Sequence, residues 1–397
     1  MGIVSALGNT VEAAAARLRK LENCVSCLDE LAAFKGLNSH LGCLAAFSRP
    51  QHWTRKTTRT MGPVAEYALA ATEQAVAQAG LDAATLESGR CGVAYGSCSG
   101  SVNAHLDLYS MFAASEVKNI TSGTYIKLMP QTTACNLSVH YHTHGRLVPT
   151  GTACTSGSLA IGNSYELIKY GIQDVMLAGG AEEFSPTQVA VFDTLYATSI
   201  RNSAPKTTPA PYDADRDGLV VGEGAGTLVL EEYEHAKARG AKMLAEIVGF
   251  FENTDGTHVT NPNRATMASC LAGALADAAL PADAIAYVNG HGTATKNGDI
   301  AETNATYDMF GRAVPISSTK SYIGHALGAC GAIEAEMVVS MMNDGWFHPN
   351  LNFKNRDPEC APLDYIAGDG RAIDAEYAMS NNFAFGGVNT SLVFRRV

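Results

Sequence analysis

The sequence predicts an α/β protein made of two packed halves, and three observations support this prediction. The chain has 397 residues, which exceeds the length that one hydrophobic core usually serves. Segments with strand-like and helix-like apolar patterns alternate along it. Two stretches of small residues, 152–162 and 320–336, stand in equivalent positions, each after a strand and at the start of a helix.

Glycines and apolar spacing mark the individual elements. Residues 62–80 have helical spacing and end on glycine, and residues 90–97 have the pattern of a buried strand. The same alternation continues towards the C-terminus. It predicts strands at 146–153, 174–183, 226–232, 244–252 and 284–290, and helices at 156–171, 233–240 and 267–280.

The two small-residue segments are expected at the centre of the molecule. A helix so rich in Gly, Ala and Ser is stable when neighbouring elements pack against its backbone on nearly all sides. Their equivalence indicates an internal duplication. We place the division near Glu234, which gives halves at 1–234 and 235–397.

The composition is that of a compact globular protein, with 46% apolar and 17% charged residues. A net charge of −11 argues against a nucleic-acid partner. Neither an apolar run of the roughly 18 to 20 residues that cross a bilayer nor a secretion signal is present, so we expect a cytoplasmic protein without a membrane partner. The ten cysteines contain no CxxC pair and are expected to be reduced thiols.

Four basic residues gather around Trp53 in this acidic protein: Arg49, Arg55, Lys56 and Arg59. Such a cluster can receive an anionic partner. It can equally be an ordinary solvated loop, and charge alone leaves both interpretations open.

Cys154 is the strongest candidate for a nucleophile. It lies in GTACTSGS, where a predicted strand meets a helix start. The N–H groups and dipole at a helix N-terminus favour an anion, so the pKa of this thiol is expected to lie below that of free cysteine. Taken alone, a cysteine among small residues is more often inert packing.

Two histidines strengthen the catalytic interpretation of Cys154. His291 lies in a polar, glycine-rich loop after a predicted strand, and His325 begins the second small-residue helix, five residues after Lys320. Each histidine alone would more often be structural. Together with a cysteine at a strand-to-helix turn they favour catalysis.

Other chemistries fit the sequence less well. A zinc site usually shows a short pair such as CxxC or HExxH, and neither occurs. A serine hydrolase would present GxSxG at the nucleophile turn, where this chain has cysteine. The glycines at 222–226 precede a predicted strand, whereas a dinucleotide fold has GxGxxG before a helix.

Around these residues the sequence resembles the β-ketoacyl-acyl-carrier-protein synthases, the elongating condensing enzymes of fatty-acid and polyketide synthesis. The resemblance covers nearly the whole chain, and its motifs occur in the family's order: TACTSG, YDADRDGLVVGEGAG, NGHGTAT, STKSYIGHALGACGAIE and SNNFAFGGVN. The initiating branch has asparagine in place of His325, thiolases use a second cysteine, and chain-length-factor relatives lack the nucleophile. The resemblance therefore implies the elongating branch and its thiolase-like duplicated α/β fold, five-layered as α-β-α-β-α.

The resemblance also implies a decarboxylative Claisen condensation. Cys154 would carry the acyl chain, while His291 and His325 bind the thioester carbonyl of malonyl-carrier protein as carbon dioxide leaves. The N–H groups of Cys154 and Phe385 would hold the tetrahedral oxyanion, and the glycines beside Phe385 would let its loop move as a gate. No bound cofactor takes part, since the substrates arrive on the phosphopantetheine arm of acyl-carrier protein.

Further residues match family positions with implied roles. Lys320 would orient the histidines and favour their neutral form, and Glu302 would be held with that lysine. Thr293 and Thr295 would contact the phosphopantetheine arm. The other implied positions are Phe383, Phe192 and Ser99 at the acyl pocket, Thr132 reaching the partner's acyl tunnel, Arg55, Lys56 and Arg59 at carrier-protein docking, and Asn289, Glu334, Ser380 and Asn381 around a structural Na⁺ or K⁺ ion found in some relatives.

The chain departs from the family pattern in three places. Lys296 stands where relatives usually have proline, so carrier docking is expected to differ. Ser99 stands where they often have a bulky residue, which predicts a deeper or more polar acyl pocket. The chain begins at MGIVSALGN, where the family has a preceding strand, and without that strand the first sheet would lose a central element.

Three functional hypotheses follow. The first is a 3-oxoacyl-[acyl-carrier-protein] synthase of fatty-acid-type synthesis, and the second is the same chemistry in a specialised polyketide or polyene pathway. The third is a non-catalytic partner subunit, against which the intact Cys154, His291 and His325 argue. In each case the resemblance implies a homodimer, or a heterodimer with a related subunit.

Overall fold

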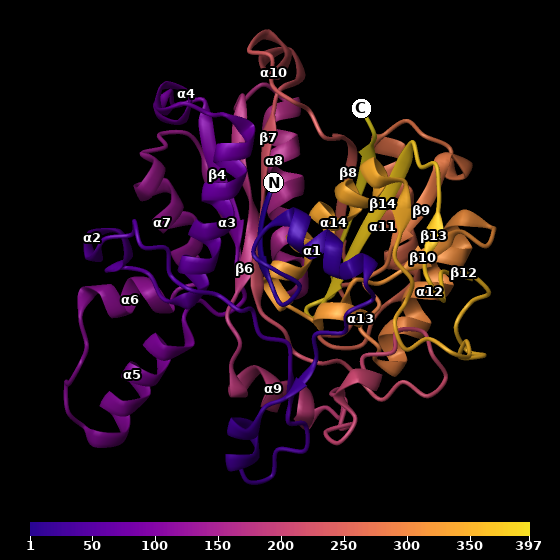
Figure 1. Ribbon diagram of the computed structural model, residues 1–397, viewed down its shortest axis with the longest axis horizontal. Helices are drawn as coiled ribbons and strands as arrows, with labels where there is room; N and C mark the ends of the chain where they lie inside the picture. Colours follow the sequence, from indigo (N-terminus) through magenta and orange to yellow (C-terminus); the bar gives the residue numbers. More distant parts are fainter.

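The computed structural model describes residues 1–397 as two large β-sheets with helices between and around them, and two small two-stranded sheets (Figure 1). The N-terminal sheet has the order β1-β7-β6-β4-β5, formed by β1 (Gly2–Ser5), β4 (Cys91–Gly96), β5 (Leu147–Thr150), β6 (Val175–Glu182) and β7 (Gly224–Glu231). The C-terminal sheet has the order β12-β10-β9-β14-β15-β8, formed by β8 (Glu246–Thr254), β9 (Ile285–Asn289), β10 (Pro315–Ser317), β12 (Asp364–Tyr365), β14 (Tyr377–Ala384) and β15 (Val388–Arg395).

The pairing of the strands confirms the internal duplication. In the first sheet β4 lies parallel to β5 and β6, β6 is antiparallel to β7, and β7 is antiparallel to β1. In the second sheet β9 lies parallel to β10 and β14, β14 is antiparallel to β15, and β15 is antiparallel to β8. The two halves therefore share one topology, to which the second adds β12 at an edge.

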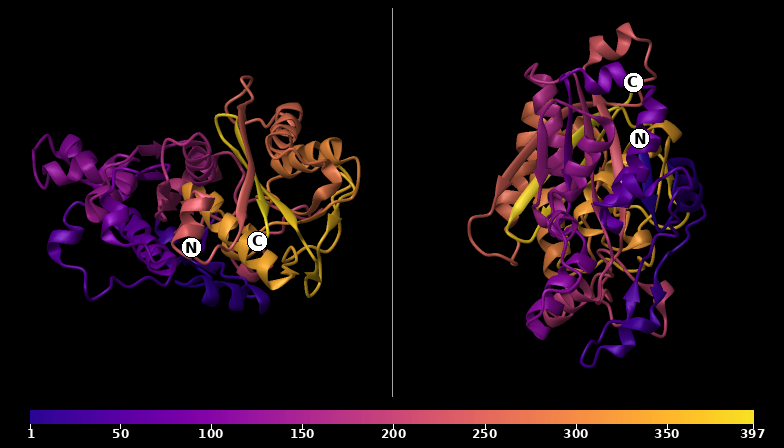
Figure 2. Two further views of the ribbon diagram at one scale, coloured as in Figure 1. Left: turned by 90° about the horizontal axis from the view of Figure 1, so that it is seen from above. Right: turned by 90° about the vertical axis from the view of Figure 1, so that its left-hand side faces the viewer.

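Three helical layers alternate with the two sheets (Figure 2). The outer layer of the first sheet contains α3 (Pro63–Ala79) and α7 (Thr132–Tyr141), and that of the second contains α11 (Arg264–Asp277) and α12 (Lys296–Phe310). Between the sheets lie α8 (Ser156–Lys169) and α14 (Cys330–Asp344), which contact each other and strands of both sheets. The predicted five-layered α-β-α-β-α fold is confirmed.

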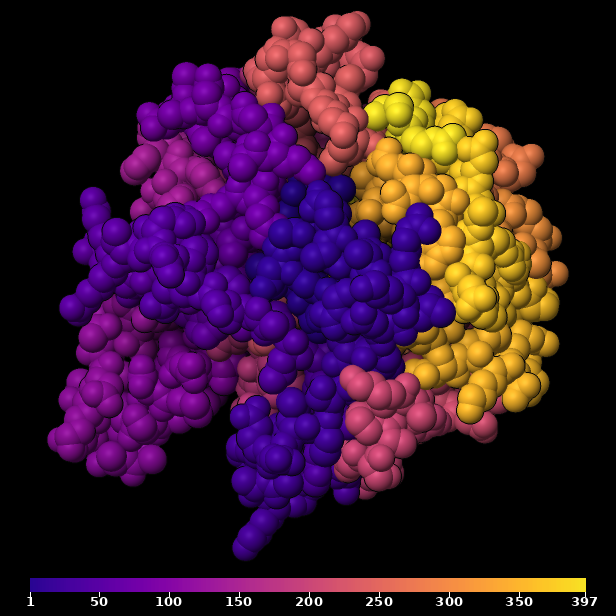
Figure 3. Space-filling model, in the orientation of Figure 1, coloured from indigo at the N-terminus to yellow at the C-terminus, as the bar shows by residue number.

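The remaining elements connect or extend these layers. The helices are α1 (Val11–Arg19), α2 (Arg55–Thr58), α4 (Ala83–Glu87), α5 (Val102–Ala114), α6 (Ser122–Leu128), α9 (Pro186–Thr194), α10 (Tyr233–Ala238) and α13 (Lys320–Ile323), and the short strands are β2 (Ser26–Cys27), β3 (Leu41–Gly42), β11 (Trp346–Phe347) and β13 (Arg371–Ala372). Helices α5 and α6 form a lobe that projects from the body (Figures 1 and 3). The division near Glu234 falls in α10, between the last strand of the first sheet and the first strand of the second, and stays a prediction.

The central helices are made of small residues because backbone packs directly on backbone there. A Cβ atom on Gly157 of α8 would lie 3.0 Å from the Ala332 nitrogen of α14, and one on Gly226 of β7 would lie 2.7 Å from the Ile333 nitrogen. Larger side chains would push α8, α14 and the first sheet apart. Close packing at the centre therefore fixes where the start of α8 and the start of α14 meet.

One expectation about the N-terminus is wrong. Residues Gly2–Ser5 form β1, which pairs with β7 along Gly224–Thr227. This position is the edge of the first sheet and not its centre.

No helix combines the length and apolar character needed to cross a bilayer.

The contact between β7 and α14 yields a stability prediction. Gly226→Ala should lower the free energy of unfolding by about 1–3 kcal/mol, because the new methyl group meets the backbone of Ala332 and Ile333. Urea denaturation measures the change. Gly123→Ala in α6 is the matched control: its Cβ would meet atoms only at 3.4 Å and beyond, so stability should stay the same or rise by up to about 1 kcal/mol. Equal effects of the two substitutions would contradict the packing argument.

Candidate active site

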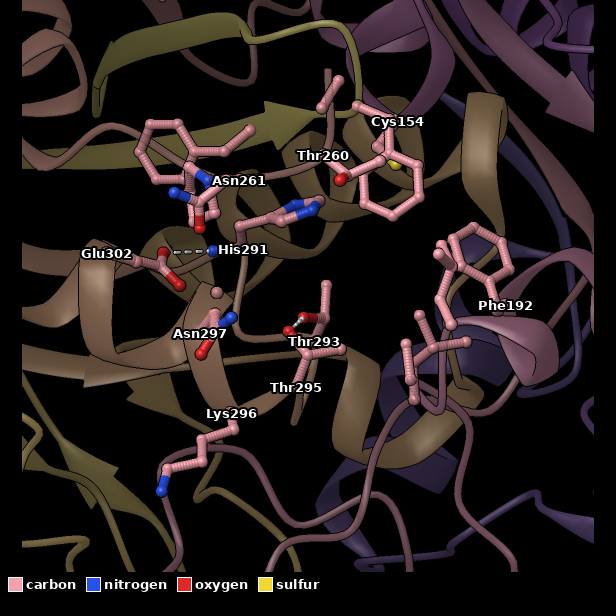
Figure 4. A pocket seen from close by; sticks show the side chains of 18 of the residues that line it. Cys154, Phe192, Thr260, Asn261, His291, Thr293, Thr295, Lys296, Asn297 and Glu302 are labelled. Carbon is pink, nitrogen blue, oxygen red and sulfur yellow. Dashed lines mark hydrogen bonds between the residues drawn. The ribbon is translucent and has the colours of Figure 1, made fainter. Parts of the chain in front are cut away.

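Cys154, His291 and His325 come together at one cavity, although each belongs to a different segment of the chain (Figure 4). Cys154 stands between β5 and α8, and the left-handed backbone of Ala153 (φ 49°) makes the tight turn that presents it. His291 follows β9, and His325 follows α13. All three side chains are buried at the wall of a cavity of about 470 Å³.

The Cys154 sulfur and the ring nitrogens of the two histidines lie close together. His325 Nε2 lies 3.0 Å from Cys154 Sγ. The sulfur and one ring nitrogen of each histidine all lie within 4.8 Å, and the two imidazole rings meet edge to face at 5.2 Å. The predicted Cys-His-His group is therefore assembled in the folded chain.

Hydrogen bonds at Nδ1 orient both imidazoles. The Leu327 N–H donates to His325 Nδ1 at 3.2 Å. The Asn382 amide nitrogen lies 3.3 Å from His291 Nδ1, and because the same nitrogen donates to Glu334 at 2.7 Å, the group facing His291 is a donor. A neutral imidazole that accepts at Nδ1 carries its proton on Nε2. Both histidines thus offer an Nε2–H donor, whereas a zinc ligand would need an unprotonated nitrogen there.

Burial, together with the charge of Lys320, keeps the two histidines neutral. The Lys320 ammonium is paired with the Glu334 carboxylate, and both side chains are fully buried. Burial and then the Lys320 charge lower the pKa of His291 and of His325 well below the ordinary value, and for His291 the second histidine adds to the effect. Neutral donors can polarise a carbonyl without giving up a proton.

The pKa of the Cys154 thiol differs from the prediction. Burial raises it to about 11, while Lys320 and the backbone N–H groups of Phe385 and Cys154 act in the opposite direction without overcoming burial. The expected lowering at a helix start is therefore wrong for the resting state. The N–H groups at the helix start favour the thiolate, but the depth at which the sulfur lies outweighs them.

The cavity in front of these atoms is lined by residues of both halves (Figure 4). Thr293 and Thr295 share a hydrogen bond of 2.9 Å. The rings of Phe192 and Phe385 are 5.4 Å apart, and Phe383 meets His291 edge to face at 6.2 Å. All five line the cavity, and their roles towards a substrate stay predictions.

Comparison with known proteins identifies the family. Residues 1–236 match the family "Beta-ketoacyl synthase, N-terminal domain" and residues 244–354 match "Beta-ketoacyl synthase, C-terminal domain". The chain belongs to the beta-ketoacyl synthase family. The resemblance inferred from the motifs is confirmed, and this synthase is an enzyme of the acyltransferase type.

Individual relatives cover the whole chain. A "3-oxoacyl-[acyl-carrier-protein] synthase 2" of Vibrio cholerae is 37% identical over 100% of this chain and 98% of its own length. The crystal structure of a beta-ketoacyl synthase from Burkholderia phymatum is 55% identical with a TM-score of 0.98 and covers 100% of this chain and 98% of that one. The structure of "the ishigamide ketosynthase/chain length factor" is 28% identical with a TM-score of 0.90, covering 100% and 97%.

The expected pairing of Glu302 with Lys320 is wrong. Glu302 accepts hydrogen bonds from the backbone N–H groups of His291 and Gly292, at 2.5 and 2.7 Å. Burial raises the pKa of Glu302 to about 8. Glu302 thus fixes the loop that carries His291, while the partner of Lys320 is Glu334.

Two residues predicted at the acyl pocket or the partner's tunnel do not line this cavity. The Ser99 N–H donates to buried Glu182 at 3.3 Å. Thr132 has no exposed surface within its own chain, and its hydroxyl accepts from Asn136 at 3.1 Å. The roles of both residues stay predictions.

The predicted basic cluster is reduced to three residues. Arg49 is paired with Glu66, whereas Arg55, Lys56 and Arg59 are exposed on or beside α2 and have no acidic partner. At the cavity, Lys296 points away from Cys154 (Figure 4) and pairs with Glu359 at 3.2 Å.

The four residues expected around a monovalent cation do not form an oxygen cage with their side chains. Glu334 already faces Lys320, and Asn289 turns its amide nitrogen to Glu334 and Ser380, at 3.5 and 3.3 Å. The Asn381 oxygen accepts from Ser391. A cation prefers acceptor oxygens, so we derive no role for Na⁺ or K⁺ here.

Asn382 and Glu182 support the site but were not singled out from the sequence. Asn382 lies within the SNNFAFGG motif and links Glu334 to His291. Glu182 accepts from the N–H groups of Cys98 and Gly328, at 2.7 and 3.2 Å, which ties the loop after β4 to the turn after His325. In the sequence, Asn382 could have been recognised because it lies within a motif shared with the family. Glu182 could not, because an acid at the end of a strand is common.

The buried ion pair leads to a prediction about stability and pH. Lys320→Met should lower the free energy of unfolding by about 3–5 kcal/mol, because Glu334 is left as an unpaired buried charge. Lys320→Met/Glu334→Gln should recover most of that loss in urea denaturation. Without the Lys320 charge the pKa values of both histidines rise, so in this double variant the acid limb of malonyl decarboxylation should move to higher pH.

The exposed pair of Arg264 and Asp308 is the matched control. Arg264→Met should change stability by less than about 1 kcal/mol. A double variant as unstable as Lys320→Met, or one with an unmoved acid limb, would contradict the roles given to the pair.

Proposed function

We propose that this synthase performs the 3-oxoacyl-[acyl-carrier-protein] synthase reaction, the decarboxylative condensation of a Cys154-bound acyl chain with malonyl-carrier protein. The observation that carries the proposal is the group of Cys154, His291 and His325, whose reactive atoms lie within 4.8 Å and whose imidazoles both offer Nε2–H. Full-length relatives named for this activity support it.

The first step loads the enzyme. The Cys154 sulfur attacks the thioester of acyl-carrier protein, and its proton passes to the departing carrier thiol. His325 Nε2–H, 3.0 Å from the sulfur, stabilises the thiolate as it forms. The N–H groups of Cys154 and Phe385 face this sulfur and would bind the oxyanion of the tetrahedral intermediate.

The second step forms the carbon–carbon bond. Malonyl-carrier protein places its thioester carbonyl at the two Nε2–H donors, and loss of carbon dioxide leaves an enolate whose oxygen they stabilise. The enolate carbon attacks the Cys154 thioester, the C–S bond breaks, and the thiolate regains a proton. Thr293 and Thr295 would hold the phosphopantetheine arm along the cavity wall.

A second candidate is the same reaction in a specialised polyketide or polyene pathway. Lys296 at the cavity supports it, as does the similarity to the ishigamide ketosynthase/chain length factor. Turnover with saturated and with unsaturated acyl carriers separates the two. A non-catalytic partner role has less support, because Cys154 and both histidines are present and oriented.

We further infer that this synthase acts as a dimer, with itself or with a related subunit. Strand β5 is one of the two edges of the first sheet, and an unpaired edge is a template for another chain. The α5–α6 lobe exposes the large apolar side chains Leu106, Tyr109, Phe112 and Tyr125, and a patch of this kind marks a protein interface.

Separate variants distinguish the two steps. Cys154→Ala should form no acyl adduct by intact-protein mass spectrometry and no condensation product, while malonyl decarboxylation continues. His291→Ala should still form the adduct but release carbon dioxide about 10²–10³ times more slowly, because one of two carbonyl donors is lost. Condensation that persists unchanged in Cys154→Ala would sink the covalent mechanism.

Carrier-protein docking on α2 is tested by charge reversal. Arg55→Glu/Arg59→Glu should raise the KM for acyl-carrier protein by about tenfold or more at low salt and leave kcat nearly unchanged, because unpaired cations attract an acidic partner. Lys242 lies in the segment between β7 and β8, is exposed and has no acidic partner. It supplies the control Lys242→Glu. Lys242→Glu changes the charge by two units and the double variant changes it by four, so a control effect about half as large on the logarithm of KM would mean that only net charge matters.

A further inference from the structure

Gln188 is a buried amide with no hydrogen-bond partner. Its side chain is 8% exposed, and neither Nε2 nor Oε1 contacts a donor or acceptor. A covered, unpaired amide costs the free energy of its lost hydration. Asp193, another buried polar residue of α9, has its hydrogen bonds satisfied. Its carboxylate accepts from the N–H groups of Asn38 and Ser39 and from the Thr198 hydroxyl.

A structural role does not explain Gln188. It stands three residues after Ser185, the N-cap of α9, in the spacing of a capping box. The Ser185 hydroxyl accepts from the Thr187 N–H as a cap should, but the Gln188 side chain makes no return bond. Both amide atoms are covered by their own chain, so a partner for them reaches them only from inside the protein, after the covering side chains have moved.

The surroundings of Gln188 are the apolar side of the active-site cavity. On α9 it shares the buried face with Val189 and Phe192, and Phe192 lies one helical turn further on. Phe192 lines the cavity with Cys154 and packs on Phe385. Gln188 itself does not line the cavity.

The cluster around α9 contains Leu31, Val189, Phe192, Leu219, Val221 and Leu327, with Cys98, Phe184 and Phe385 at its border. A chain attached to Cys154 that passes Phe192 and Phe385 would enter this cluster. The loop of Phe385 continues into Gly386 and Gly387, whose φ angles of 90° and 71° lie in the region that favours glycine. A change in this loop would carry the Phe385 ring away from Phe192 and open the way into the cluster. Gln188 would then be the polar group that meets the end of the acyl chain farthest from Cys154.

We propose that the Gln188 amide recognises an oxygen atom on the acyl chain, and that this synthase prefers acyl groups bearing a distal hydroxyl or carbonyl over plain hydrocarbon chains. The inference rests on the proposed acylation of Cys154. An amide offers both a donor and an acceptor, so either oxygen function can satisfy it. A hydrocarbon chain would leave the amide unpaired, and a site built to hydrogen-bond its substrate rejects the analogue that lacks the group.

A competition experiment tests the proposal. Wild-type enzyme is given equal amounts of octanoyl-carrier protein and one hydroxyoctanoyl-carrier protein, with the hydroxyl moved one carbon at a time along the distal half of the chain. Intact-protein mass spectrometry follows the Cys154 adducts. At least one isomer should react about fivefold to tenfold faster than octanoyl, the effect of one additional hydrogen bond.

The variant Gln188→Met keeps the length of the side chain and removes the amide. It should abolish the preference by accelerating octanoyl transfer and slowing transfer of the favoured isomer. Gln173→Met is the matched control, because Gln173 is equally buried but donates to the Ile172 carbonyl and accepts from the Arg146 N–H. It should lower stability and leave the preference intact.

The outcomes separate the hypotheses. If wild type forms octanoyl adducts but prefers no hydroxylated isomer, the proposal for Gln188 is wrong even if the variant does not fold. If Gln188→Met is more stable with an unchanged preference, the amide is only a packing defect or is held by a trapped water molecule. Absence of any Cys154 adduct from any carrier would instead overturn the proposed function.

Discussion

The chemistry of this synthase depends on one buried ion pair, that of Lys320 and Glu334. The Glu334 carboxylate, on α14, faces the ammonium of α13 and accepts a hydrogen bond from Asn382 of β14. The negative charge of Glu334 thereby holds α13, α14 and β14 together. A buried ion pair seldom adds net stability, because desolvation offsets its attraction. Here its effect is to fix geometry.

That geometry decides which atom of each imidazole faces the substrate. Asn382 can present its nitrogen to His291 because the same nitrogen is held by Glu334, and His325 is fixed by the backbone of Leu327. Burial lowers the pKa values of both imidazoles, and the positive charge of Lys320 lowers them further. Two neutral N–H donors result, and they can stabilise an enolate oxygen without protonating its carbon.

Much of this could be predicted from the sequence, because patterning and motif order are local properties. The alternation of elements and the small-residue helices follow from residues near one another in the chain, and Cys154, His291 and His325 are each marked by the short motif that contains them. The partner of Lys320 does not. Glu302 and Glu334 are both helical acids, and only the placement of α12 and α14 decides which one meets the lysine. The burial of Thr132 likewise depends on packing and not on residue type.

The depth of Cys154 has a consequence for the life of the enzyme in a cell. A thiol whose pKa is raised to about 11 is almost entirely protonated between catalytic cycles. Peroxides and electrophiles attack thiolates, and buried neutral thiols react slowly with them. The raised pKa therefore lowers the reactivity of the resting thiol towards such reagents.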